Sequence, residues 1–235
     1  MSALLTIQHM KTDIGQYKVL HDVSFAVPEE GVFVLLGRNG AGKTTTLRSI
    51  MGLWQPSPGS ILFRGTDITG LHTADIARLG IAYVPEDMGI FGGLTVAENL
   101  VLATATGVPD DTRLARIFAL FPAIEKFWTS PARALSGGQK QMLAVARAII
   151  EPRALILIDE PTKGLAPAII DAMADAFAEV ATTTPILLVE QNFHFARRLG
   201  KNVAVIEDGQ VVHQGTMTDF AADRDLQERL LSLSA

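Results

Sequence analysis

LSGGQ at Leu135–Gln139, followed by LILIDE at Leu155–Glu160, decides the fold of this chain. Upstream of both lies a glycine-rich loop, GRNGAGKT, at Gly37–Thr44. Alone, such a loop indicates only that a nucleoside triphosphate binds, because the same loop serves kinases, GTPases and motors. The order of the three stretches is far more specific, and it predicts one nucleotide-hydrolysing unit.

Bulk properties bound the class of protein. The chain has 235 residues, enough for a large core, but one copy of each motif, so residues 1–235 are read as a single domain. Lysine and arginine total 20 against 25 acidic residues, and this mild acidity argues against nucleic acid as a partner. The longest apolar runs are far shorter than the roughly twenty residues that cross a bilayer. Lacking cysteine and a secretory leader, the chain is expected in the cytosol.

Short apolar runs predict a parallel sheet. VFVLL at Val32–Leu36 is continuously apolar, as expected for a parallel strand that is covered on both faces. Ala154–Ile158 and Ile186–Val189 are runs of the same kind, separated by a predicted helix over Pro167–Ala181. The sequence therefore predicts an α/β fold whose parallel strands are far apart along the chain.

Two other regions have different periodicities. Leu4–Met10 and Val23–Val27 alternate apolar with other residues, which predicts an antiparallel pair at the sheet edge. Val96–Ala105 and Asp111–Phe121 have the apolar spacing of helices.

The predicted organisation is discontinuous. A core of residues 1–85 and 151–215 is interrupted by a mostly helical subdomain over about 86–150, and short amphipathic helices close the chain over 216–235. QPSPG at Gln55–Gly59 is read as a turn into another strand, so no second fold is expected.

The glycine-rich loop follows a predicted strand and precedes a helix that begins near Lys43, as phosphate binding requires. Its glycines let backbone N–H groups approach phosphates closely. Lys43 is predicted between the β- and γ-phosphates, Thr44 on Mg²⁺ and Thr45 on an α-phosphate oxygen. The predicted nucleotide-binding residues are Gly37, Arg38, Asn39, Gly40, Ala41, Gly42, Lys43, Thr44 and Thr45, with no individual role for Arg38 or Asn39.

Two carboxylates end the LILIDE strand, at the sheet edge where α/β folds bind ligands. Asp159 is predicted to hold Mg²⁺, and Glu160 to polarise the water that attacks the γ-phosphate. The structural alternative, in which both merely cap the next helix, is weaker because a phosphate loop lies upstream.

LSGGQ opens a predicted helix that continues to Ile149. Ser136, Gly137, Gly138 and Gln139 would present free N–H groups and a hydroxyl at the positive end of that helix, an arrangement that binds anions. A lone SGG could be an ordinary N-cap, but its place before LILIDE makes a chance match negligible.

Together these motifs resemble the ATP-binding-cassette (ABC) ATPases. The resemblance implies a P-loop NTPase fold with a RecA-like parallel core, an antiparallel β edge and an inserted α-helical subdomain, with ATP and Mg²⁺ bound. In that family two cassettes enclose two nucleotides head to tail. Ser136, Gly137, Gly138 and Gln139 would then face the nucleotide of the partner, whereas Lys43 and Glu160 act on the nucleotide of this chain.

Four positions depart from the common cassette pattern. Glu86, in YVPED, replaces a glutamine and is predicted to ligate Mg²⁺ or hold water. Gln191 replaces the switch histidine and is predicted to be catalytic by donating to the γ-phosphate, whereas His194 is read as a helix-surface residue. Ala166 replaces an aspartate, and Ile14 stands where an adenine-stacking aromatic is usual. The nearest aromatic is Tyr17, which either stacks on adenine or packs outward from its strand.

YVPE, LTVAENL, QKQMLAVARA, DEPTKGLAP and LLVEQN resemble the smaller ATPase of Liv-type importers for branched-chain and other hydrophobic amino acids. This implies a peripheral location at the cytoplasmic face of a bacterial inner membrane. It also implies two membrane-spanning permease subunits, a second ABC ATPase as heterodimer partner and, indirectly, a periplasmic solute-binding protein. A homodimer is physically possible because this chain carries every motif.

Alternative functions are an importer of amides or urea, an exporter, or a soluble ABC ATPase without a transport role. The apolar segment Met88–Leu94, beside Glu86, is predicted to receive a short helix from a membrane subunit. The alternative is that these residues pack within the helical subdomain.

Overall fold

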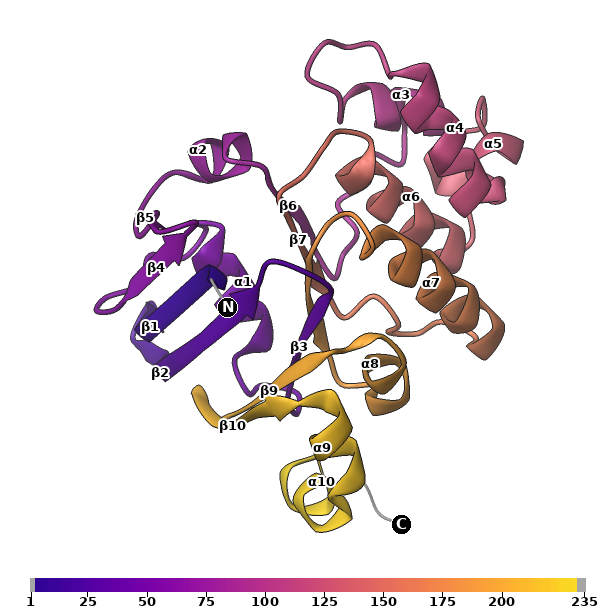
Figure 1. Ribbon diagram of the computed structural model, residues 1–235. Helices are drawn as coiled ribbons and strands as arrows, with labels where there is room; N and C mark the ends of the chain where they lie inside the picture. Colours follow the sequence, from indigo (N-terminus) through magenta and orange to yellow (C-terminus); the bar gives the residue numbers. More distant parts are fainter. Residues whose placement is uncertain (1–2, 232–235) are drawn as a thin grey trace.

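The fold is described for residues 3–231 in a computed structural model, in which ten strands form one sheet (Figure 1). Their order is β5-β4-β1-β2-β10-β9-β3-β8-β7-β6. The strands are β1 (Ala3–Ile14), β2 (Tyr17–Pro28), β3 (Val32–Leu36), β4 (Ser60–Phe63), β5 (Thr66–Asp67), β6 (Ile81–Val84), β7 (Leu155–Asp159), β8 (Ile186–Glu190), β9 (Asn202–Glu207) and β10 (Gln210–Thr216).

Helices cover this sheet and fill the long connection between β6 and β7 (Figure 1). They are α1 (Lys43–Ile50), α2 (Thr73–Arg78), α3 (Val96–Val101), α4 (Asp111–Leu120), α5 (Pro122–Lys126), the 3-10 helix η1 (Ala132–Ala134), α6 (Gly137–Ile149), α7 (Pro167–Val180), α8 (Phe193–Leu199), α9 (Met217–Ala222) and α10 (Arg224–Leu231). None of these described helices is long and apolar enough to span a membrane.

The predicted apolar strands form the parallel centre of the sheet. β3 lies between β8 and β9, and β7 lies between β8 and β6, all in parallel. Every residue of β3, β7 and β8 is buried. Val34 faces one apolar core and Leu35 the other, which explains why the run is apolar without interruption.

The antiparallel pair predicted near the N-terminus is also confirmed. β1 pairs with β2 on one side and with β4 on the other, and their apolar side chains face the core that they share with α1. This region joins the parallel centre through β10, which is antiparallel to β9 and meets β2 at Gln210 and Asp22.

Residues 86–150 contain the expected helices, but the first is shorter than predicted. α3 ends at Val101 rather than continuing to Ala105, because the Thr104 hydroxyl and backbone N–H both donate to the Val101 carbonyl. Leu102 is 58% exposed there, so the next position buries little apolar surface that would favour a longer helix. The C-terminal helices begin as predicted, and residues 232–235 of that prediction lie outside the described residues.

Gly209, in the turn between β9 and β10, places that turn against the glycine-rich loop. Its N–H donates to the Ala41 carbonyl over 2.9 Å, and its φ of +70° lies in the left-handed region. A Cβ at this position would lie 2.2 Å from the Val19 carbonyl oxygen, closer than non-bonded atoms approach.

Gly209→Ala should therefore lower the free energy of unfolding by roughly 1–3 kcal/mol more than Gly107→Ala, measured by urea denaturation. Gly107 is the matched control, because its φ is +77° but a Cβ there meets nothing within 4 Å. Left-handed strain alone costs each variant about 1 kcal/mol. If both variants lose the same free energy of unfolding, the added Cβ at position 209 is accommodated beside Val19 without cost.

Candidate nucleotide site

The glycine-rich loop connects β3 to α1, as predicted. Gly42 is the N-cap residue of α1, with a φ of +108°, and a Cβ there would lie 2.6 Å from the Leu20 side chain. Only glycine therefore fits without a shift. The first N–H groups of α1 face the end of the loop, which is the arrangement that binds phosphate.

The Lys43 ammonium is buried inside this loop, and the side chain is 4% exposed. It donates to the Gly37 carbonyl over 2.8 Å and to the Arg38 carbonyl over 3.0 Å. It also forms an ion pair of 3.0 Å with Glu160. The two residues predicted to act on the same phosphate are therefore in contact.

Asp159 is completely buried at the end of β7. Its carboxylate accepts hydrogen bonds from the Thr44 hydroxyl, over 3.0 Å, and from the Tyr83 hydroxyl, over 3.2 Å. Burial raises the pKa of Asp159 to about 6; the two hydrogen bonds oppose this rise, and the charges of Glu160 and Glu86 add to it. Burial likewise raises the pKa of Tyr83, with the Asp159 charge adding to it.

Glu160 has a strained backbone for a residue with a side chain. Its φ is +43°, and its N–H donates to the Val189 carbonyl of β8 over 2.9 Å. Non-glycine residues in this region cost free energy and gather at functional sites. The turn directs the carboxylate back toward Lys43.

Oxygen donors of this chain fit a magnesium ion at Thr44 and Asp159. Among residues 3–231 no group of three or more histidine, cysteine, aspartate or glutamate side chains could hold a metal. Mg²⁺ does not require such a group, because it keeps several waters and uses one or two protein ligands together with phosphates. The Glu86 carboxylate instead contacts the Lys163 ammonium over 2.5 Å, so a metal-binding role for Glu86 stays a prediction.

Thr44, Glu86 and Lys163 line one hollow of about 360 Å³, whereas the fully buried Asp159 is not among its lining residues. Val19 lines the hollow from β2. Neither Tyr17 nor Ile14, the positions considered for adenine stacking, is among its described lining residues. Tyr17 is 68% exposed. The lining residues are Val19, Asn39, Gly40, Gly42, Lys43, Thr44, Thr45, Glu86, Glu160 and Lys163.

Gln191 lies beside this site rather than inside the first hollow. It lines a second one with Glu160, Thr162 and Glu190. His194 is exposed on α8, as the sequence predicts.

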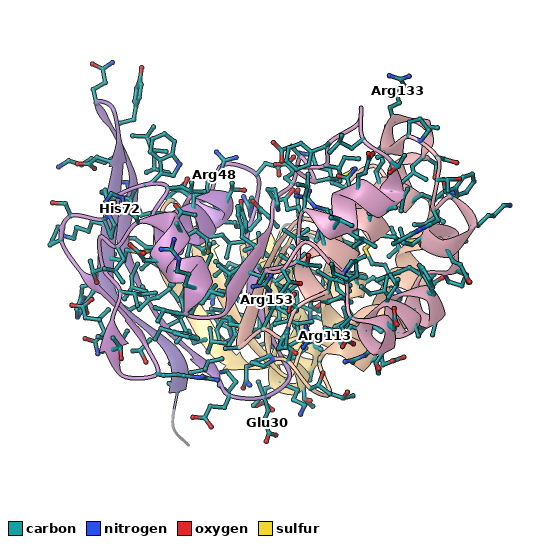
Figure 2. All side chains as sticks on the ribbon, turned by 90° about the horizontal axis from the view of Figure 1, so that it is seen from above. Glu30, Arg48, His72, Arg113, Arg133 and Arg153 are labelled. Atoms are coloured by element: carbon teal, nitrogen blue, oxygen red, sulfur yellow. The ribbon has the colours of Figure 1, made fainter. Side chains whose placement is uncertain are left out.

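The LSGGQ peptide opens α6 as expected. Ser136 is the N-cap, its hydroxyl accepts from the Gln139 N–H, and the Gln139 side chain accepts from the Ser136 N–H. Arg133, just before this peptide, and Arg48, on the helix of the glycine-rich loop, lie on opposite lobes in Figure 2. Within the described chain, none of the five residues of this peptide lines the hollow at Lys43.

Comparison with known proteins identifies the family. Residues 20–163 match the family described as "ABC transporter". The chain belongs to the ABC transporter family. Because that family hydrolyses ATP to drive transport, this chain is an ATP-binding and ATP-hydrolysing subunit.

Two similar ABC proteins have names that give their cargo. The chain is 36% identical to the "High-affinity branched-chain amino acid transport ATP-binding protein BraG" of Pseudomonas aeruginosa, over 91% of this chain and 93% of that protein. It is 34% identical to the "Probable branched-chain amino acid transport ATP-binding protein LivF" of Archaeoglobus fulgidus, over the same shares. The crystal structure of a nucleotide-free ATP-binding cassette from an ABC transporter matches with a TM-score of 0.82, at 22% identity and 100% coverage of both chains. The predicted ABC ATPase fold is confirmed.

Several contacts of this ABC site escape sequence reasoning. Tyr83 holds Asp159, Lys163 holds Glu86, and the Arg38 guanidinium donates to the Arg229 carbonyl of α10. None of these pairs is close in sequence. Glu190 is a further site residue that sequence reasoning missed, but the sequence does contain a signal for it. It ends an apolar strand, as Asp159 does.

The raised pKa of Asp159 predicts a pH dependence of stability. In the unfolded chain this carboxyl titrates near its ordinary value of 3.8, and in the folded chain at about 6. Between these values the unfolded chain has lost a proton that the folded chain keeps, so the free energy of unfolding falls as pH rises.

Relative to Asp159→Asn, the wild type should therefore lose roughly 1–3 kcal/mol from about pH 4 to about pH 6. Urea denaturation of both proteins without Mg²⁺ or nucleotide would measure this difference, because ionisable groups that do not interact with Asp159 contribute equally to both proteins. If the difference in the free energy of unfolding between the two proteins stays constant across this range, the pKa of Asp159 is not raised in the folded chain.

Proposed function

We propose that this chain powers the import of branched-chain and other hydrophobic amino acids from the cytoplasmic face of a bacterial inner membrane. The observation that carries this proposal is the likeness to two branched-chain amino acid ATPases along nearly the whole of each chain. The proposed complex has two membrane-spanning permease subunits, a second ABC ATPase and a periplasmic solute-binding protein that delivers cargo.

The contacts at Lys43 support a division of roles within the site. An arriving phosphate competes with the Glu160 carboxylate for the Lys43 ammonium, because both are anions beside the same cation. Glu160 released in this way can accept a proton from the attacking water. Gln191 donates its amide to the γ-phosphate from the adjoining hollow.

Thr44 and Asp159 hold Mg²⁺ in this proposal. When bound, Mg²⁺ neutralises the charge that develops on phosphate oxygens. The carboxylate needs a positive charge nearby, because in the described structure its direct hydrogen-bond partners are two neutral hydroxyls.

The separation of LSGGQ from Lys43 supports a head-to-tail pair of cassettes. Ser136 and Gln139 then complete the site of the partner, and the partner completes the site at Lys43. The second ATPase of a Liv-type complex is the expected partner, and a homodimer is also possible because both halves of a site are present here.

A hollow between β6 and α6 supports docking of a permease. Its floor is largely apolar, with Tyr83, Pro85 and Met88 among its lining residues and a volume of about 380 Å³. Arg147 holds its rim, because the guanidinium donates to the Gly89 carbonyl over 2.5 Å and lies 5.0 Å from the Phe91 ring centroid. Phe91 is 49% exposed. A short cytoplasmic helix of a permease is the proposed occupant, with the helical subdomain of residues 86–150 as one wall.

The proposed catalysis predicts that Glu160→Gln, in the reconstituted complex, hydrolyses ATP at least about a hundredfold more slowly while still binding ATP. Glu179→Gln is the matched control, because Glu179 is exposed and pairs only loosely with Arg116. Leucine, isoleucine or valine with the binding protein should stimulate the wild type. Stimulation by urea or amides alone would refute the cargo, and an active Glu160→Gln would refute the catalytic role.

The proposed docking predicts that Phe91→Ala lowers amino-acid transport per ATP hydrolysed, several-fold, with nucleotide affinity unchanged. Val108→Ala is the control, because Val108 is an exposed apolar residue of the same helical region that does not line this hollow, whereas Phe91 packs against Arg147, which does. Transport in vesicles and phosphate release would be measured together. Unchanged coupling in Phe91→Ala would exclude Phe91 from the permease interface.

A further inference from the structure

Glu190 is a buried carboxylate that ends β8 and lines the hollow next to the nucleotide site. It is 2% exposed and lies in register with Leu36, the last residue before the glycine-rich loop. The residue before it, Val189, is in register with Asp159. Glu190 thus occupies the strand end between the phosphate loop and the catalytic strand.

Its two oxygens serve two different loops. Oε1 accepts from the Thr162 N–H over 3.2 Å and from the Thr162 hydroxyl over 2.8 Å. Oε2 accepts from the N–H groups of Gln191, over 3.0 Å, and Asn192, over 2.9 Å. Thr162 follows Glu160 by two residues, so one carboxylate joins the turn of Glu160 to the loop of Gln191.

The type of side chain is what makes this junction possible. A carboxylate has acceptor sites for four donors, whereas an amide has one oxygen and brings donors of its own. Within the described chain, no lysine or arginine forms an ion pair with Glu190, so these four hydrogen bonds alone compensate for burying its charge. Burial nevertheless raises the pKa of Glu190 above its ordinary value, although the hydrogen bonds oppose the rise.

A second contact extends the junction. Lys163, next to Thr162, pairs with Glu86 at the entry to the helical segment. Consecutive contacts therefore run from Gln191 through Glu190, Thr162 and Lys163 to Glu86. Glu86 follows Pro85, which lines the apolar hollow of β6 and α6.

We propose that Glu190 is a positioning residue that makes the Gln191 loop and the turn after Glu160 move as one unit. A displacement of Gln191 on the loss of the γ-phosphate is then transmitted to Thr162 and Lys163. This inference rests on the proposed roles of Glu160 and Gln191, and it assigns to Glu190 no contact with nucleotide.

Glu190→Gln tests this coupling in the assembled transporter. Whichever way the new amide turns, one of the two loops loses a backbone acceptor, so the link breaks while volume is preserved. We expect kcat to fall about tenfold, with KM and ATP affinity within about twofold of wild type. Amide hydrogen exchange should quicken at Thr162 or at Gln191 and Asn192.

Two further variants sharpen the test. Thr162→Val removes the hydroxyl donor but keeps the backbone donor, so kcat should fall in the same direction by less. Glu151→Gln is the matched control, because that carboxylate pairs with Arg113 outside both hollows of the site, and it should leave kcat and exchange unchanged.

A kcat within about twofold of wild type in Glu190→Gln, or a change in KM alone, would overturn the inference. If that variant does not fold, amide hydrogen exchange of the wild type tests the coupling instead. Exchange at Thr162, Gln191 and Asn192 should change together when ATP is added, and independent changes would refute the coupling. A wild type that neither hydrolyses ATP nor responds to amino acids would instead refute the proposed function.

Discussion

The hydrogen bond from Thr44 to Asp159 joins the two halves of this site, and the surrounding structure depends on it. It connects the first turn of α1 to the end of β7, and the Tyr83 hydroxyl secures the same carboxylate from β6. Apolar side chains cover both faces of the parallel strands, so polar groups can be placed only at the strand ends. The price of burying Asp159 there is a raised pKa, which a nearby cation would offset.

Much of the fold could be predicted because its strongest signals are local. Continuous apolar runs identify β3, β7 and β8, and strict motif context fixes where α1 and α6 begin. β6 is only four residues long, and β10 is exposed or half-buried along its whole length, so neither gives a long apolar signal in the sequence. β10 owes its place to its pairing with β9 and to its single register contact with β2, which no local pattern encodes.

The candidate site likewise contains residues that local motifs predict and contacts that they do not. Lys43, Thr44, Asp159 and Glu160 belong to stretches whose chemistry is readable in isolation, and the structure brings them together. Lys163 and Glu86 meet across 77 positions of sequence, and their contact follows from the way β7 lies beside β6. Predicting that contact requires the strand order as well as the motifs.

The pairing of charges explains these contacts together. In the described chain Glu160 is held by Lys43 and Glu86 by Lys163, whereas Asp159 has only hydroxyl donors. On the proposed roles, a phosphate displaces Glu160 from Lys43, and a magnesium ion supplies the charge that Asp159 lacks. Nucleotide binding then exchanges ion pairs instead of adding unpaired charge to a buried site, which limits the desolvation cost. The same exchange frees the one carboxylate that must act as a base, so binding and activation of Glu160 follow from a single competition at Lys43.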